Sequence, residues 1–279
     1  MPVLSQSRTR LIARLQRRKS REREGLVLVE GPRAVGEVWA ALQEPAPRRD
    51  AGRAPWFVAS PRLHDLAPDL AAHLAQPAGD TLHGIGLDVT WVDDAELAVL
   101  SATEAHQGVL MVVAEPRVEL PEVIRTGARL LVLDGIQDPG NVGTLVRTAA
   151  AFALDGVIAL DGTVDPWNPK AVRSAAGSSF RMPLVTSNWA AVADALATSG
   201  VPLWVADTGG HDIDALGASA LAAGWALVLG SEGQGARAEI VAAATDKIAV
   251  PMPGGTESLN VAVAGALLTY ALTRRPTAP

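Results

Sequence analysis

Six short apolar runs in the second half of the chain constrain its fold more than any other feature. Each run is rich in Val, Leu or Ile, and segments with helical spacing separate one run from the next. Strands that are apolar on both faces belong in a parallel sheet covered by helices on both sides. The sequence therefore predicts an α/β domain over residues 129–279, with strands at residues 130–133, 156–160, 183–185, 203–206, 226–229 and 248–250.

The first half of the chain alternates in the same way on a smaller scale. Residues 25–115 predict a second α/β domain. Its expected strands are residues 26–29, 56–59, 89–92 and 109–114, its expected helices are residues 7–23, 61–74 and 94–100 with one more around Val35–Leu42, and its expected loops are residues 44–55 and 80–86. Pro and polar residues at 116–128 indicate a linker. The predicted division is therefore 1–115, 116–128 and 129–279.

Charge is distributed unevenly along the chain. The whole protein carries a net charge of −6, but residues 1–25 hold eight Lys or Arg against two Glu. Such a basic arm on an acidic body fits contact with nucleic-acid phosphates. A solvated helix with no ligand is the alternative interpretation.

Several classes of protein are disfavoured by what the sequence lacks. The chain has no Cys, and none of its five His residues pairs at a spacing of four, so we expect neither a disulfide framework nor a metal site. It has no uninterrupted apolar stretch of about 18 residues, so we expect no membrane span. Residues 1–23 lack the apolar centre of a secretion signal, and we therefore expect a cytosolic protein.

Three motifs follow predicted strands, where parallel sheets place their ligand sites. The first is Asn141-Val142-Gly143-Thr144, with Arg147 farther along the same predicted helix. On its own, Asn141 is a helix cap and Arg147 a surface side chain. A functional Arg147 would sit near a helix N-terminus, where phosphate is favoured.

The second motif is Gly230-Ser231-Glu232-Gly233-Gln234-Gly235, and the third runs from Val250-Pro251-Met252 to Ser258-Leu259-Asn260. Glycines permit a tight turn or close approach of backbone to a ligand. Ser258 suits the start of an apolar C-terminal helix, whereas Asn260 inside that helix is disfavoured and suggests contact with a ligand or another chain. Neither motif is a dinucleotide fingerprint or a P-loop, which disfavours a nucleotide-dependent oxidoreductase.

Together the three motifs resemble those of the SpoU (TrmH-type) RNA 2′-O-ribose methyltransferases, over roughly residues 129–274. The resemblance implies a SPOUT fold, in which the C-terminal parallel-sheet domain contains a deep trefoil knot and binds S-adenosyl-L-methionine. It also implies a homodimer with the C-terminal helix in the interface, and a smaller N-terminal α/β domain that binds the RNA substrate.

The implied reaction is methylation of a ribose 2′-hydroxyl in structured RNA. The N-terminal domain favours 23S rRNA as substrate; a tRNA substrate, or a non-catalytic RNA-binding assembly factor with the same fold, are the alternatives. By position in the motifs, the implied residues are Asn141, Arg147, Glu232, Ser258 and Asn260 for catalysis, and Gly230, Ser231, Gly233, Val250, Met252 and Leu259 for the cofactor. Outside the motifs, the residues expected to contact RNA are Arg14, Arg18, Arg33 and Arg173.

Overall fold

The computed structural model describes residues 4–43, 54–76, 81–82, 85–101, 105–213 and 224–274. Of the predicted loop at 44–55, only residues 54 and 55 fall within these ranges. The chain divides into two units by its contacts. Unit 1 comprises Met1–Arg117 and Trp167–Phe180, and unit 2 comprises Val118–Pro166 and Arg181–Pro279.

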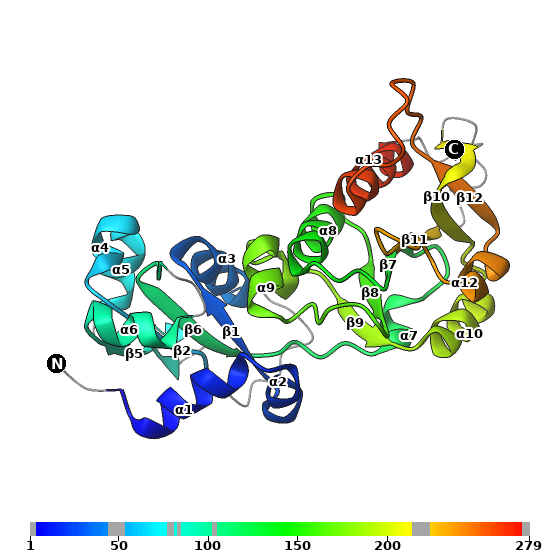
Figure 1. Ribbon diagram of the computed structural model, residues 1–279. Helices are drawn as coiled ribbons and strands as arrows, with labels where there is room; N and C mark the ends of the chain where they lie inside the picture. Colours follow the sequence, from blue (N-terminus) through cyan, green and yellow to red (C-terminus); the bar gives the residue numbers. More distant parts are fainter. Residues whose placement is uncertain are drawn as a thin grey trace. The chain divides into compact units, whose positions relative to one another are not determined.

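Unit 2 is built on a six-stranded parallel sheet (Figure 1). The strand order is β12-β10-β11-β7-β8-β9, and every neighbouring pair is parallel. This confirms the predicted α/β class and parallel sheet. Chain order reverses between β7 and β11, because β8 and β9 extend the sheet on one side of β7 and the later strands extend it on the other. The strands are β7 (Arg129–Asp134), β8 (Gly156–Leu160), β9 (Leu184–Ser187), β10 (Leu203–Asp212), β11 (Trp225–Gly230) and β12 (Asp246–Ala249).

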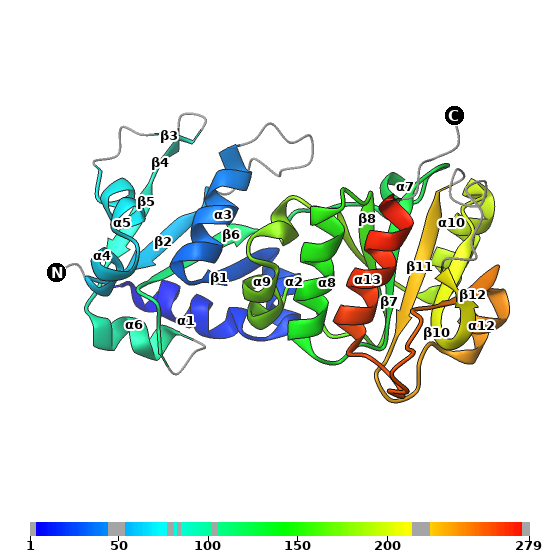
Figure 2. The same cartoon turned by 90° about the horizontal axis from the view of Figure 1, so that it is seen from above.

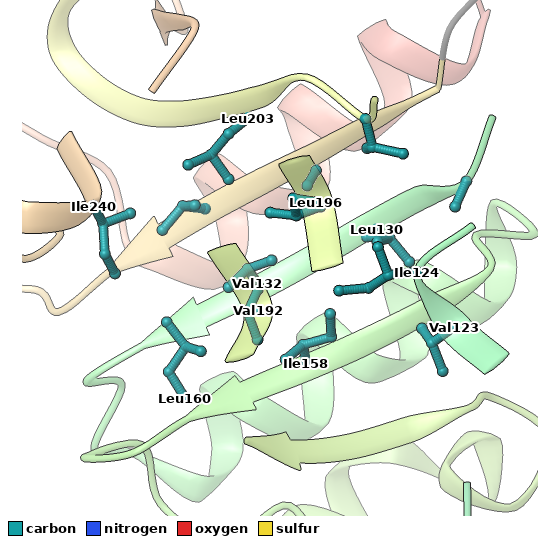
Figure 3. Close-up of a cluster of buried hydrophobic side chains, with 14 of the residues drawn as sticks. Val123, Ile124, Leu130, Val132, Ile158, Leu160, Val192, Leu196, Leu203 and Ile240 are labelled. Atoms are coloured by element: carbon teal, nitrogen blue, oxygen red, sulfur yellow. The ribbon is translucent and has the colours of Figure 1, made fainter. Parts of the chain in front are cut away.

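Helices cover both faces of this sheet, as Figure 2 shows. Helices α8 (Pro139–Ala151) and α13 (Val261–Arg274) pack together on one face. Helices α7 (Leu120–Val123), α10 (Trp189–Ser199) and α12 (Ala238–Ala243) cover the other. There, alternate strand residues such as Leu130, Val132 and Ile158 pack against Val192 and Leu196 of α10 (Figure 3).

Unit 1 contains a four-stranded mixed sheet in the order β1-β6-β2-β5. Its strands are β1 (Leu26–Glu30), β2 (Trp56–Ala59), β5 (Asp88–Trp91) and β6 (Val109–Ala114). Ile12 and Leu15 of α1 (Gln6–Leu15) and Leu97 of α6 (Asp94–Leu100) pack with Leu28 and Leu110 in one core. Trp39 of α3 (Pro32–Gln43) packs edge-on against Phe57, with ring centroids 5.6 Å apart.

Several predicted boundaries differ from the structure. The helix expected at 7–23 is two helices, α1 and α2 (Arg18–Glu24), because Arg17 is extended between them and buried Arg21 donates to the carbonyl oxygen of Leu15 at 2.8 Å. Pro68 divides the helix expected at 61–74 into α4 (Arg62–Leu66) and α5 (Pro68–Leu74). The loop expected at 80–86 contains two short strands, β3 (Thr81–Leu82) and β4 (Ile85–Gly86).

The segments expected as linker and as strand 203–206 also carry more structure than predicted. Helix α7 lies within residues 116–128, and Val123 and Ile124 are buried in the core of unit 2. Strand β10 continues past Ala206, where its register with β12 shifts, as far as Asp212. These features depend on contacts with distant strands, so local composition alone does not reveal them.

One segment of the predicted C-terminal domain groups with unit 1. Trp167–Phe180 contains α9 (Pro169–Ala175) and the short helix η1 (Ser178–Phe180). Gly177 has a φ of +80°, and a Cβ there would overlap the side chain of Glu37 in α3. Such close backbone approach requires glycine. The division at residue 129 predicted from the sequence therefore does not describe this segment.

None of the helices within the described ranges has the length and apolar character that crossing a lipid bilayer requires.

Candidate active site at the carboxyl edge of the parallel sheet

The second and third motifs meet in one pocket of about 660 Å³ at the carboxyl ends of β10, β11 and β12. Its lining includes the turn after β11, the segment after β12 and the residues that lead into α13. Ligands of α/β proteins bind at this edge, and the volume lies within the usual range of small-molecule sites. The residues predicted for the site that line the pocket are Gly230, Ser231, Glu232, Val250, Met252, Ser258, Leu259 and Asn260.

A chain of side-chain hydrogen bonds joins the first motif to the other two. Asn141 Nδ2 donates to Glu232 Oε1 at 2.6 Å, and Asn260 Nδ2 donates to Asn141 Oδ1 at 3.1 Å. Asn260 Oδ1 accepts from the backbone N–H groups of Ala262 at 3.0 Å and Val263 at 3.3 Å. The amide groups of both Asn residues are therefore oriented by their partners, and Glu232 is held in the lining of the pocket.

The structure corrects the expected role of Asn141 as a helix cap. Helix α8 begins at Pro139, and the side chain of Asp138 caps it by accepting from the backbone N–H of Gly140 at 2.8 Å. Pro fits the first turn because its missing N–H would have no helical partner there. Asn141 consequently lies inside the first turn, and its side chain is available for Glu232.

Asn260 and Ser258 also differ from expectation. Helix α13 begins at Val261, two residues later than a start capped by Ser258 would place it. Asn260 precedes the helix and caps it through its side-chain oxygen, so it is not a disfavoured interior residue. Ser258 is exposed and lines the pocket.

The turn after β11 forms a tight wall of the pocket. Ser231 and Gly235 exchange backbone hydrogen bonds of 3.1 and 2.9 Å. A Cβ at Gly230 would overlap backbone atoms of Gly235 and Ala236, so this position excludes any larger residue without movement of the turn. A Cβ at Gly233 would meet nothing within 4 Å, and Gly233 does not line the pocket. Its assignment to the cofactor therefore stays a prediction.

The charge of the pocket indicates what kind of ligand it suits. Asp207, Glu232 and Glu257 line it, and no Lys, Arg or His of the described ranges does. The backbone N–H of Gly209, followed by Lys247, holds the pKa of Asp207 below its ordinary value, so this carboxylate is charged at neutral pH. Phosphate-bearing cofactors are unfavourable here, whereas a ligand with positive charge is favoured.

S-Adenosyl-L-methionine fits these observations. Its sulfonium and ammonium groups match the acidic lining, and Leu229, Val250, Met252 and Leu259 provide apolar surface for the adenine ring. Sequence reasoning missed Asp207, Thr208, Gln234 and Glu257 as pocket residues. The signal for Asp207 and Thr208 was their place directly after the predicted apolar strand 203–206, the same rule that identified the other motifs.

Arg147 does not line the pocket of its own chain. It is exposed on α8, and within the described ranges its side chain has no hydrogen bond or ion pair. The predicted RNA-contacting residues Arg14, Arg18, Arg33 and Arg173 all belong to unit 1. Arg18 forms an ion pair with Glu22 at 2.7 Å, and Arg173 lies 4.0 Å from the carboxylate of buried Glu30. Arg14 and Arg33 are exposed.

Comparison with known proteins gives consistent matches. Residues 128–270 match the model of the SpoU rRNA Methylase family. The chain is 36% identical over 188 residues to the 23S rRNA (guanosine(2553)-2′-O)-methyltransferase RlmP of Bacillus subtilis, covering 67% of this chain and 73% of that protein. It is 30% identical to an uncharacterized tRNA/rRNA methyltransferase of Synechocystis, over 95% of this chain and 89% of that protein.

A solved structure of a TrmH-family protein from Porphyromonas gingivalis superposes with a TM-score of 0.78 at 29% identity, covering 99% of this chain and all of that one. The SpoU methyltransferase AviRb of Streptomyces viridochromogenes superposes with a TM-score of 0.78 at 23% identity, over 97% and 98% of the two chains, and supports the fold. The family match covers half of the chain and includes all three motifs. The chain therefore belongs to the SpoU rRNA methylase family of RNA methyltransferases.

Proposed function

We propose that this enzyme methylates a ribose 2′-hydroxyl of 23S rRNA, with S-adenosyl-L-methionine as methyl donor. The observation that carries the proposal is that Glu232, Ser258 and Asn260 line one acidic pocket, with Asn141 hydrogen-bonded to two of them. The names of the relatives support rRNA as the substrate, since the Bacillus subtilis protein acts on 23S rRNA.

The pocket residues divide into those that hold the cofactor and those that orient the reacting groups. Gly230, Ser231, Val250, Met252 and Leu259 would hold the cofactor, which supplies an electrophilic methyl group when bound. Glu232 adds negative charge beside the cationic centre. Asn141 and Asn260 fix the direction of that carboxylate through their hydrogen bonds.

Arg147 is proposed to stabilise the developing charge on the 2′-oxygen. A guanidinium is protonated at every relevant pH, so it acts as an electrostatic and hydrogen-bonding group and not as a general base. Arg147 lies outside the pocket of its own chain and is exposed on α8. For this role, RNA or a second copy of the protein must therefore bind to that face of α8.

Helix α13 supports a homodimer. One side of the helix packs on α8 and β11, and Gly265 allows close contact with Leu145 and Leu229. The opposite side exposes Val263, Leu267 and Tyr270, at 48, 44 and 43% of their surface. An apolar stripe of this kind at a helix surface is typical of an interface. A dimer through this stripe involves the helix pair that also carries Arg147.

Unit 1 is proposed to bind RNA. Arg10, Arg14, Arg17 and Lys19 are exposed in α1, α2 and the junction between them, and they form no ion pair within the described ranges. Buried Ile12 and Leu15 fix α1 to the core, so the cations are displayed on a stable helix. Unpaired cations on one segment favour phosphate contacts.

A deep trefoil knot is part of the same proposal. Its support is that the chain after β12 returns to the turn after β11, so that residues from both segments, such as Met252 and Ser258 with Ser231 and Glu232, line one pocket. A tRNA substrate and a non-catalytic assembly factor are the competing hypotheses. The intact network of Asn141, Glu232 and Asn260 favours catalysis over a scaffold role.

The test measures transfer of labelled methyl groups from S-adenosyl-L-methionine to unmodified 23S rRNA and, separately, to unmodified tRNA. Mapping by primer extension at low nucleotide concentration then locates the ribose methyl. We expect one position in 23S rRNA. Methylation of tRNA alone would transfer the proposal to that substrate, and cofactor binding without any transfer would support the scaffold.

A further inference from the structure

A second cavity, of about 580 Å³, adjoins the acidic pocket. The two share the turn after β11, with Ser231, Gln234, Gly235 and Ala236 in both linings. Other walls come from Asp134, Gly135 and Gln137 at the end of β7 and from Asp161 and Gly162 after β8. Strand order reverses between β7 and β11, and open α/β sheets bind ligands at such a point.

Hydrogen bonds to the backbone make these walls rigid. Gln137 Nε2 donates to the carbonyl oxygens of Gly135, at 3.2 Å, and of Gly162. Thr163 Oγ1 donates to the carbonyl oxygen of Leu133 at 2.8 Å and accepts from the N–H of Gly135 at 3.0 Å. The cavity is thus formed before any ligand arrives, which a selective site requires.

A buried ion pair fixes the wall that Asp134 and Arg237 form. Asp134 is buried, and its carboxylate accepts from the backbone N–H and from Nε of Arg237, at 2.8 and 2.7 Å. Both oxygens of Asp134 are therefore engaged, and the Arg237 guanidinium is partly neutralised. These two residues hold the wall and leave recognition to other groups.

Three polar groups of the cavity have no partner within the described ranges. They are the exposed carboxylate of Asp161, the side-chain amide of Gln234 and the oxygen Oε1 of Gln137. A free carboxylate repels phosphate, so the cavity does not suit the RNA backbone. It suits an uncharged group that presents hydrogen-bond donors to Asp161.

We propose that this cavity binds the base of the target nucleotide and that Asp161 selects guanine. The inference rests on the proposed function. A ribose that reacts in the first pocket lies at the turn after β11, which both cavities share, and its base is one glycosidic bond away. The Watson–Crick edge of guanine places two donors side by side, N1–H and the 2-amino group, and one carboxylate accepts from both. Unstacked RNA bases are commonly recognised on this edge.

The other bases fit this arrangement poorly. Adenine and cytosine present an unprotonated ring nitrogen at the corresponding place, which a carboxylate repels, and uracil offers a single N–H between two oxygens. The side-chain amide of Gln234, which also lines the cavity, is available to donate to O6 of guanine. Asp161 is thus a specificity-determining residue, separate from the groups that line the first pocket.

The experiment compares target bases with wild-type enzyme and two variants. After the methylated position in 23S rRNA is mapped, RNA fragments that span it are made with guanosine, inosine or adenosine at that position. Inosine keeps N1–H and O6 and lacks only the 2-amino group. The variants are Asp161→Asn and, as a matched control, Asp194→Asn on the exposed face of α10.

We expect the wild-type kcat/KM to fall on the order of 10- to 100-fold from guanosine to inosine, since a hydrogen bond to a charged group is lost. In Asp161→Asn this difference shrinks to about 3-fold or less, since a neutral amide discriminates weakly. Asp194→Asn keeps the wild-type difference. Calorimetry should show unchanged binding of S-adenosyl-L-methionine in both variants, which verifies that they are folded.

Two results would overturn the inference alone: a mapped target that is not guanosine, or full discrimination against inosine in Asp161→Asn. Failure of the wild-type enzyme to methylate any RNA would instead remove the proposed function, and this inference with it.

Discussion

Asn141 and Glu232 lie 91 residues apart in the sequence, and Asn141 Nδ2 donates to Glu232 Oε1 at 2.6 Å. The contact joins the first turn of α8 to the turn after β11. Asn260 completes it from the N-terminus of α13. One hydrogen-bonded group therefore links the three motifs, and its disruption is the most direct test of the candidate site.

Asn141→Asp should lower methyl transfer on the order of 100-fold, because two carboxylates at this separation repel each other and displace Glu232. The double variant Asn141→Asp/Glu232→Gln restores a hydrogen bond with donor and acceptor exchanged. We expect it to recover about 10-fold of the lost activity. Single-turnover transfer rates measure both, and near-normal activity of Asn141→Asp would show that the contact is dispensable.

Arg147→Ala should lower the turnover rate by at least about 100-fold and leave cofactor binding unchanged. The side chain is exposed and makes no described hydrogen bond or ion pair, so the free energy of unfolding should change by less than about 0.5 kcal/mol. Calorimetry with S-adenosyl-L-methionine and methyl-transfer assays separate the two effects. Nearly normal turnover would exclude Arg147 from the active site.

Gly230→Ala should destroy the pocket wall, because the added Cβ overlaps backbone atoms of Gly235 and Ala236. We expect cofactor binding to be lost and the protein to be destabilised by about 1 to 3 kcal/mol. Gly254→Ala is the matched control, since its Cβ would meet nothing within 4 Å and the residue does not line the pocket. Equal effects of both substitutions on binding and melting temperature would contradict the steric explanation.

Leu267→Glu should convert the proposed dimer to a monomer, because it places a charge in the exposed apolar stripe of α13. Val99→Glu, on α6 of unit 1, substitutes a Val that is 83% exposed and should leave the assembly intact. Analytical ultracentrifugation gives the mass of each. A wild-type protein that sediments as a single chain would rule out the dimer.

Lys247→Met should destabilise the protein at neutral pH by less than about 1 kcal/mol, because the Lys247–Asp207 pair is partly exposed. The pKa of Asp207 is lowered in the folded protein, first by the Gly209 N–H and then by Lys247. A lowered pKa stabilises the fold above its ordinary value of 3.8, and that contribution disappears as pH falls through the folded value. The difference in thermal unfolding between the two proteins should therefore be full at pH 6 and shrink as the pH is lowered below 3.8. A difference that persists at the lower pH would indicate lost packing.

The sequence by itself determined the α/β class, the parallel sheet and the segments that form the pocket. Apolar runs such as 130–133 and 226–229 have no polar side, so they must be buried on both faces of the sheet, and their pattern alone predicts this place. The polar and glycine-rich segments that follow those strands had to meet at one edge, which is why Glu232 and Ser258 could be grouped before the structure was known.

Only the tertiary structure decided how the side chains are used. Asn141 and Ser258 suit helix caps by local rules, yet Asp138 and Asn260 perform that role. Which residue caps a helix depends on where the preceding segment places the chain. Here that position is set together with hydrogen bonds between residues 91 and 119 positions apart. The acidic lining, the second cavity beside it and the grouping of Trp167–Phe180 with unit 1 likewise depend on distant segments. No local pattern encodes them, because their energies arise only when those segments meet.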